Sequence, residues 1–265
     1  MGRENNMINI MKSQLYQLKR TGLICIVFVC VLIMQFTSLM GEMNFLDSAI
    51  TAGKYVAENG TAVAFVSLIF ALVFTGEVCG ADFIDKTTNY ELMSGHLRKE
   101  VYFGRAMISL FIGTTGTLIL NALPVVIAYI LGGWGSEVSF FDIFFRYLLS
   151  IFPIVRIICE FIFLSYIIKN AYIVMAAGVV ISLAGSGWTE MFPNGSPKYM
   201  GMGSLSEIFD IPFWATYTLV GEKNIVVYDA ALSAGNVAGT ILSSVLFGGL
   251  FLLLGYLYFK KDDLN

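Results

Sequence analysis

The chain has 265 residues, of which 57% are hydrophobic and only 13% are charged. A soluble globular domain carries nearly twice that charged fraction, so this composition excludes an ordinary soluble fold. A net charge of −3 and a single histidine give no support to nucleic-acid binding or to histidine-based catalysis.

Residues 1–20 precede the first long apolar stretch and carry apolar side chains at helical spacing beside a basic face. This pattern predicts an amphipathic helix that lies along the cytoplasmic membrane surface, with its cations near anionic lipid. The alternative is a polar leader without stable structure. The apolar positions are Met7, Ile8, Ile10, Met11, Leu15 and Leu18, and the cations are Lys12, Lys19 and Arg20.

Six apolar stretches follow. A spanning helix needs about 17–25 mainly apolar residues, because the hydrocarbon core is about 30 Å thick and a helix rises about 1.5 Å per residue. The second and fifth stretches are short and need flanking residues, which extends the second to positions 62–79. We predict an all-α integral membrane protein with six transmembrane helices in a single domain, residues 1–265. The stretches are Gly22–Met40, Ala62–Gly76, Ala106–Leu131, Tyr147–Ile168, Ala171–Gly187 and Val237–Phe259.

The charges between the stretches sort by side. Four segments hold eleven Lys or Arg residues, whereas three others hold only three such residues but ten acidic ones. Cytoplasmic loops are enriched in Lys and Arg, so this asymmetry places both termini in the cytoplasm, as an even number of spans requires. The basic segments are 1–20, 78–105, 169–170 and 260–265, and the acidic ones are 41–61, 132–144 and 188–236.

Small residues recur at intervals of four in the last stretch and let helix backbones approach closely. The pattern predicts a packing face, used either within the chain or as the seam of a dimer. Its members are Ala234, Gly235, Ala238, Gly239 and Ser243, followed by Gly248, Gly249 and Gly255.

The acidic segment 188–236 is not an ordinary polar loop. Its stretch Leu205–Val220 is apolar, too short to span and interrupted at Pro212. This predicts a re-entrant or interface-lying pair of short helices on the outer side. Phe213 and Trp214 are candidates for an outer gate over the exit of a transport route. The alternative is that these aromatic side chains only anchor the segment at the headgroup level.

Residues 77–105 form the longest and most charged connection on the cytoplasmic side. A helix-forming segment between two spans, here residues 80–100, offers charged groups to a soluble partner and is tied to helices that can move. The alternative is a solvated connector without a function of its own.

This segment resembles the corresponding part of the permease subunits of type-2 ABC exporters, in which a coupling helix follows an acidic residue at the end of the second span. The layout of the whole chain agrees with that family, although His96-Leu97 stands where many relatives carry a proline. The matching positions are Glu77, Lys86-Thr87-Thr88, Glu91-Leu92-Met93-Ser94, Leu97-Arg98-Lys99 and Gly104-Arg105.

The resemblance implies a permease of the bacterial plasma membrane that pairs as a homo- or heterodimer and docks on a cytoplasmic ATPase. The chain contains no phosphate-binding G-x-x-x-x-G-K-[ST] motif, so ATP and Mg²⁺ are expected on the partner subunit. We expect no catalytic residue, cofactor site or metal ligand in this chain. The expected coupling residues are Glu77, Lys86, Thr87, Glu91, Arg98, Lys99 and Arg105.

Arg156 and Glu160 lie in the fourth stretch, four residues apart and therefore on one face of a helix. A charge at mid-bilayer costs at least ~2.5–3.5 kcal/mol, so both side chains must face protein, water or each other. They either line a transport route or form an internal salt bridge, to which Asn121 of the third stretch contributes.

The spans contain few polar residues, which disfavours a hydrophilic pore. The predicted function is ATP-driven export of a hydrophobic or amphipathic cargo, such as an antimicrobial or cytolytic peptide, a lipid-like molecule or a drug. The competing prediction is a gradient-driven secondary carrier or ion channel that uses Arg156 and Glu160 as coupling groups. A membrane scaffold without transport is a third alternative, which explains the coupling-like segment poorly.

Overall fold

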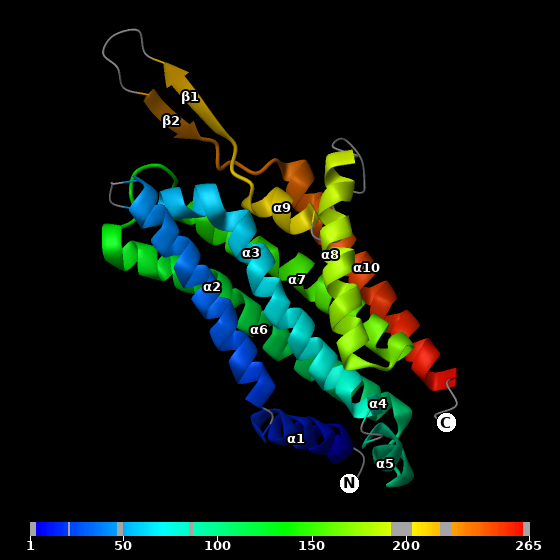
Figure 1. Cartoon of the computed structure of the whole chain (residues 1–265). Helices are drawn as coiled ribbons and strands as arrows, with labels where there is room; N and C mark the ends of the chain where they lie inside the picture. Colours follow the sequence, from blue (N-terminus) through cyan, green and yellow to red (C-terminus); the bar gives the residue numbers. More distant parts are fainter. Residues whose placement is uncertain are drawn as a thin grey trace.

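The computed structural model describes residues 4–20, 22–46, 50–84, 87–191, 203–217 and 224–261. Long helices that lie side by side make up most of the molecule (Figure 1). Both ends of the chain lie at the same end of this bundle, which we call the terminal end. A β-hairpin projects from the opposite end, which we call the hairpin end (Figure 1).

Six helices in the described part of the chain have 21 or more residues. Five of them are long and apolar enough to cross a membrane, and in the remaining one, α8, the described apolar part is shorter. The chain is therefore a multi-pass membrane protein. The six helices are α2 (Gly22–Leu46), α3 (Ala52–Gly76), α6 (Arg98–Gly132), α7 (Phe140–Ile168), α8 (Ala171–Met191) and α10 (Ala234–Lys261).

The N-terminal helix α1 (Glu4–Arg20) confirms that this segment is helical, and it lies across the terminal end of the bundle (Figure 1). Its apolar face packs on α6, where Ile10 is buried against Gly104. Lys12 and Tyr16 on its other face are exposed. The periodic apolar residues of α1 therefore bury against protein as well as offering a face to the surroundings.

The connection at the terminal end begins with a π-helical turn, η1 (Glu77–Ala81), which continues α3. Two short helices follow, α4 (Asp82–Ile84) and α5 (Thr87–Met93), so the predicted coupling segment contains a helix. A Cβ at Gly80 would lie 2.9 Å from the Cα of Ala171, the first residue of α8. Glycine is therefore needed where the π turn and α8 touch.

Only Lys169 and Asn170 join α7 to α8. Lys169 adopts the left-handed conformation with φ of 54°, which ends α7. The Asn170 Oδ1 atom accepts hydrogen bonds from the backbone N–H groups of Tyr172 and Ile173, at 3.1 and 3.2 Å. This side chain caps the start of α8, so the turn is tight at both helix ends.

Helix α10 packs on α7 through glycines of the predicted small-residue face. A Cβ at Gly248 would lie 3.6 Å from the Cα of Arg156, and one at Gly255 would lie 3.4 Å from the Cα of Phe163. The earlier part of the stripe, including Ala238, is exposed. Close packing within the chain therefore accounts for Gly248 and Gly255.

The hairpin end differs from the prediction of two short helices. One helix is present, α9 (Gly203–Phe209), but Phe213–Tyr217 forms strand β1 and pairs antiparallel with β2 (Asn224–Tyr228). Phe213 faces Tyr228 in the register, and Tyr217 faces Asn224. The expectation of a second helix was wrong because both runs are rich in aromatic and β-branched residues, which favour strands over helices.

Candidate functional site

A buried ion-pair network occupies the terminal end and centres on Arg105 of α6, whose side chain is fully buried. Its Nη2 atom lies 2.8 Å from Oδ2 of Asp82 in α4 and 2.7 Å from Oε2 of Glu91 in α5. Its Nη1 atom donates a hydrogen bond of 2.7 Å to the hydroxyl of Thr88. One guanidinium therefore holds both short helices of the connection against α6.

The Asp82 carboxylate receives two further hydrogen bonds. Thr87 donates to its Oδ1 atom at 2.7 Å, and the side-chain amide of Gln14 in α1 donates to Oδ2 at 2.7 Å. Gln14 is 2% exposed, so this contact is inside the protein. We call Gln14, Asp82, Thr87, Thr88, Glu91 and Arg105 the Arg105 network; it joins α1, α4, α5 and α6.

Burial raises the pKa of Glu91 above its ordinary value, although the Arg105 charge acts in the opposite direction. The desolvation of the Glu91 carboxylate therefore outweighs its attraction to the Arg105 cation. Asp82 makes more hydrogen bonds than Glu91 and is the better-supported partner of Arg105.

The structure brings together three of the predicted coupling residues, Thr87, Glu91 and Arg105, in one network. Glu77 is half-buried in η1, and Lys86 lies outside the described residues. Sequence reasoning missed Gln14 and did not single out Asp82. A polar residue on the apolar face of α1 was the available signal for Gln14.

Arg98 and Lys99, adjacent in sequence, have different surroundings. Arg98 donates hydrogen bonds to the backbone carbonyls of Phe259 and Lys260, at 2.9 and 3.1 Å. Both carbonyls belong to the last turn of α10, where a cation satisfies carbonyls that lack a partner within the helix and interacts favourably with the helix dipole. Lys99 is exposed. Arg98 therefore has a structural role, and Lys99 is accessible to a partner.

An aromatic cluster lies beside the Arg105 network. The ring centroid of Tyr102 is 4.6 Å from that of Tyr166, which in turn is 4.9 Å from that of Phe259. The Tyr102 hydroxyl donates to the Leu252 carbonyl at 2.8 Å. A Cβ at Gly255 would lie 2.6 Å from this hydroxyl oxygen, so α6, α7 and α10 meet closely here.

The predicted intramembrane polar residues do not form one cluster. Arg156 is 2% exposed and packs beside α10, and Glu160 is half-buried one turn further along α7. The carbonyl of Asn121 accepts a hydrogen bond of 2.8 Å from Tyr147, and neither polar atom of the Asn121 side chain has a hydrogen-bond partner among the described residues. The Asn121 side chain therefore makes no hydrogen bond to Arg156 or Glu160 in this structure.

A buried arginine that sequence reasoning missed lies near the hairpin end of α7. Arg146 is 1% exposed and donates to the carbonyl of Ile208, at the end of α9, and to that of Ala230 at 2.9 Å. It holds the chain on both sides of the hairpin. The signal was a cation between the acidic segment 132–144 and the expected span that begins at Tyr147.

The predicted outer-gate residues lie in strand β1. Phe213 is 64% exposed, and its ring centroid lies 6.3 Å from that of Tyr228. Trp214 is paired with Val227 in the register. The Tyr228 hydroxyl donates to Oε1 of Glu58 in α3 at 2.8 Å, which ties the hairpin to the bundle.

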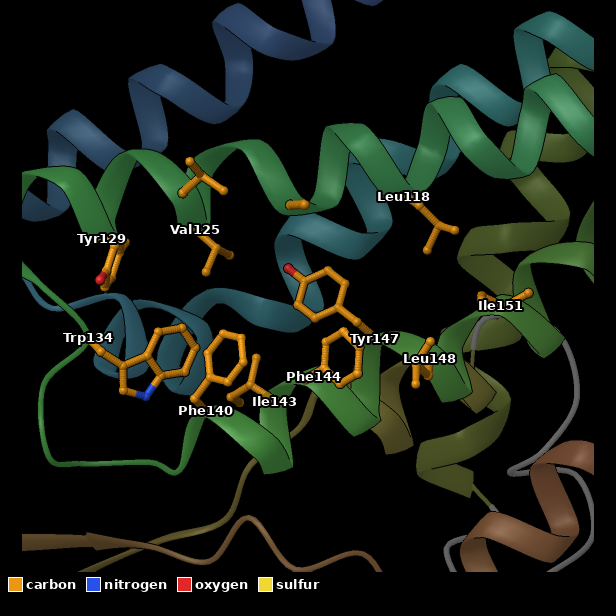
Figure 2. Close-up of a pocket in the computed structure, with 12 residues that line it drawn as sticks. Leu118, Val125, Tyr129, Trp134, Phe140, Ile143, Phe144, Tyr147, Leu148 and Ile151 are labelled. Atoms are coloured by element: carbon orange, nitrogen blue, oxygen red, sulfur yellow. The ribbon is translucent and has the colours of Figure 1, made fainter.

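A cavity of about 740 Å³ lies between α6 and α7 in the half of the bundle near the hairpin end (Figure 2). We call it the α6–α7 cavity. Figure 2 shows Tyr129 and Trp134 at one end and Leu118 and Ile151 at the other. The lining is hydrocarbon and aromatic. It consists of Leu118, Ala122, Val125, Val126, Tyr129, Trp134, Phe140, Ile143, Phe144, Tyr147, Leu148 and Ile151.

The sequence matches no protein-family model and shows no significant similarity to a curated protein.

Proposed function

We propose that the chain is the permease subunit of an ATP-driven ABC exporter in the bacterial plasma membrane. The observation that carries this proposal is the attachment of α5 to the membrane helices by Arg105, through contacts of 2.7–2.8 Å to Asp82 and Glu91. A short helix that receives a push from a soluble subunit must be held firmly by the helices it moves. The Arg105 network meets this requirement.

The proposed topology has six membrane spans, with α8 as the fifth and both termini in the cytoplasm. Two observations support it. The termini lie together at the terminal end (Figure 1), and the Lys- and Arg-rich segments gather at the same end.

In the proposed mechanism, a cytoplasmic ATPase that binds ATP and Mg²⁺ docks on α5. Its motion passes through Glu91 and Arg105 to α6 and through Asp82 to α3, which continues into α4. Gln14 carries α1 along, because it shares the Asp82 carboxylate with Arg105. By resemblance, two permease copies act together, and the cargo is hydrophobic or amphipathic, with an antimicrobial or cytolytic peptide as the best candidate.

The side chains of α5 that point away from the protein are candidates for the docking contact. Tyr90 is 67% exposed and Met93 is 83% exposed. Exposed apolar residues beside charged ones are typical of protein interfaces. Lys99, the second residue of α6, adds an accessible cation.

Co-purification with an ATP-binding cassette subunit, sought first among the neighbouring genes, tests the proposal. The double variant Tyr90→Ala/Met93→Ala should lose the ATPase while keeping its own thermal melt, because neither side chain is in the core. Tyr16→Ala, which removes an exposed tyrosine from α1 at the same end, is the matched control and should bind normally. Wild-type recovery of the ATPase by the double variant would show that α5 is not the docking element.

Arg98 and Lys99 need separate variants. Arg98→Glu removes the cation of α6 that donates to the carbonyls of the last turn of α10, so it should lower thermal stability as well as ATPase binding. Lys99→Glu should weaken ATPase binding alone. Equal losses of thermal stability in the two variants would contradict the different roles.

A further inference from the structure

The length of the α6–α7 cavity matches one leaflet of a bilayer. Its lining runs from Leu118 to Tyr129 on α6 and from Phe140 to Ile151 on α7. Eleven helical steps correspond to about 16.5 Å, and half of a hydrocarbon core is about 15 Å. The cavity therefore has the reach of one extended hydrocarbon chain that starts at the hairpin end.

The chemistry of the walls favours a ligand without hydrogen-bonding groups. The indole N–H of Trp134 donates to the Val138 carbonyl at 2.7 Å, and the hydroxyl of Tyr147 donates to the Asn121 carbonyl at 2.8 Å. These polar tips are occupied by the protein's own backbone. A peptide backbone in the cavity would lose hydrogen bonds to water without replacing them, whereas a hydrocarbon loses none.

The cavity opens toward the lipid-facing surface of α6 and α7. Four of its lining residues, Val126, Tyr129, Phe144 and Leu148, are each about half exposed. The neighbouring positions Ile130 and Phe141 are 75% and 78% exposed, so the apolar surface continues on both sides of the opening. A hydrocarbon chain can therefore enter sideways from the membrane.

Aromatic side chains in the cavity wall are held in place by other parts of the protein, and in this respect the cavity differs from an ordinary lipid-facing surface. Apolar contact alone gives no preference for protein over lipid inside a bilayer, so selective binding requires a preformed shape. Tyr147 is held by its hydrogen bond to α6 and by the Phe209 ring, whose centroid is 5.4 Å away. The rings of Trp134 and Phe140 hold each other with centroids 5.0 Å apart.

We propose that the α6–α7 cavity binds a single acyl chain of a membrane lipid from the leaflet at the hairpin end. The headgroup lies at the level of Trp134, an aromatic residue suited to the headgroup region. The acyl chain runs from Trp134 toward Leu118 and Ile151 (Figure 2). This inference concerns binding and stands independently of the proposed export function.

Photolabelling of the full-length protein in vesicles tests it. The probe is a phosphatidylcholine with a diazirine in one acyl chain, mixed at rising fractions into unlabelled lipid, and labelled residues are mapped by mass spectrometry. Labelling at the lining residues should saturate, whereas labelling at Phe111 and Leu246, which are exposed outside the cavity, should rise in proportion to the probe. Proportional labelling at all sites would overturn the proposal.

Variants that fill the cavity provide the second test. Ala122→Phe places a ring in the cavity and should abolish the saturable component of the labelling. Ala238→Phe makes the same change at an exposed position of α10 and should leave that component intact. Saturable labelling that persists in Ala122→Phe would contradict the assignment.

A photoreactive phenylalanine at position 144 identifies the occupant directly. Crosslinks to lipid that Ala122→Phe removes support the acyl-chain site, because Phe144 is half exposed and lipid on the outer surface would remain. Crosslinks to a second copy of the chain or to another protein would assign the cavity to a protein interface instead.

Discussion

The two ends of the bundle hold their buried arginines in different ways. At the terminal end, Arg105 is paired with two carboxylates and a hydroxyl from other helices. At the hairpin end, Arg146 is paired with backbone carbonyls of Ile208 and Ala230. Side-chain partners exist only at particular positions, whereas every residue offers a carbonyl. The terminal end therefore specifies which helices are held together, and the hairpin end specifies only where α9 and the hairpin attach to α7.

Loss of Arg105 should have the largest effect. Arg105→Met leaves the buried Asp82 carboxylate without its cation, which should lower the free energy of unfolding by about 3–5 kcal/mol in detergent. Adding Asp82→Asn to Arg105→Met should recover part of this loss, because the more deeply buried of the two carboxylates is then neutral. A single variant that melts like the wild type would show that the network contributes little to stability.

Loss of Arg146 should cost less, because its acceptors are neutral. Arg146→Gln should lower stability by about 1.5–3 kcal/mol, the usual value for hydrogen bonds to a charged group. Hydrogen exchange should increase in α9 and in the hairpin but not in α5. Faster exchange at both ends of the bundle would contradict the separation of the two anchoring systems.

Gly255→Ala probes the aromatic cluster. The added methyl would meet the Tyr102 hydroxyl, and such overpacking typically costs about 1–3 kcal/mol. Gly249→Ala, with no atom within 4 Å of the added methyl, is the matched control and should melt like the wild type. Similar melts for the two alanine variants would mean that α6 and α10 do not approach as closely as described.

Replacement of Glu91 should have the smallest effect. Since burial raises its pKa in the folded protein, the folded state binds this proton more tightly than the unfolded state does. The wild type should therefore gain stability relative to Glu91→Gln as the pH falls through the folded pKa toward 4.5, and lose that gain as the pH rises. Thermal melts of both proteins from pH 7 to pH 4.5 measure this difference. The opposite trend would show that Arg105 outweighs burial.

Apolar length was enough to predict the multi-pass helical class and the short link at Lys169-Asn170, and the helical spacing of apolar residues predicted α1. These features depend on local composition. The Arg105–Asp82 pair joins residues 23 positions apart and depends on how the chain folds back between α4 and α6, which no sequence period encodes. Arg146 was missed because the span was expected to begin at Tyr147, whereas α7 begins at Phe140.

The hairpin was missed for a different reason. Pro212 and a run of apolar residues suggested broken helices, and the strand signal lay in the second run, Asn224–Tyr228. Two β-rich runs around Gly221 are the pattern of a hairpin, which only becomes visible when both runs are considered together. The α6–α7 cavity arises from the packing of two helices and has no signature in either sequence stretch.

The position of Arg146 also sets an order of events during synthesis. Its two acceptors come 62 and 84 residues later in the chain. At about 5–20 residues per second, Ile208 is made about 3–12 s after Arg146. The guanidinium thus enters the membrane before its partners exist, and its burial has to wait for α9 and the hairpin to emerge. Completion of α9 and the hairpin is therefore a step in the assembly of α7, and a ribosome that stalls before Ala230 would leave Arg146 without one of its two acceptors.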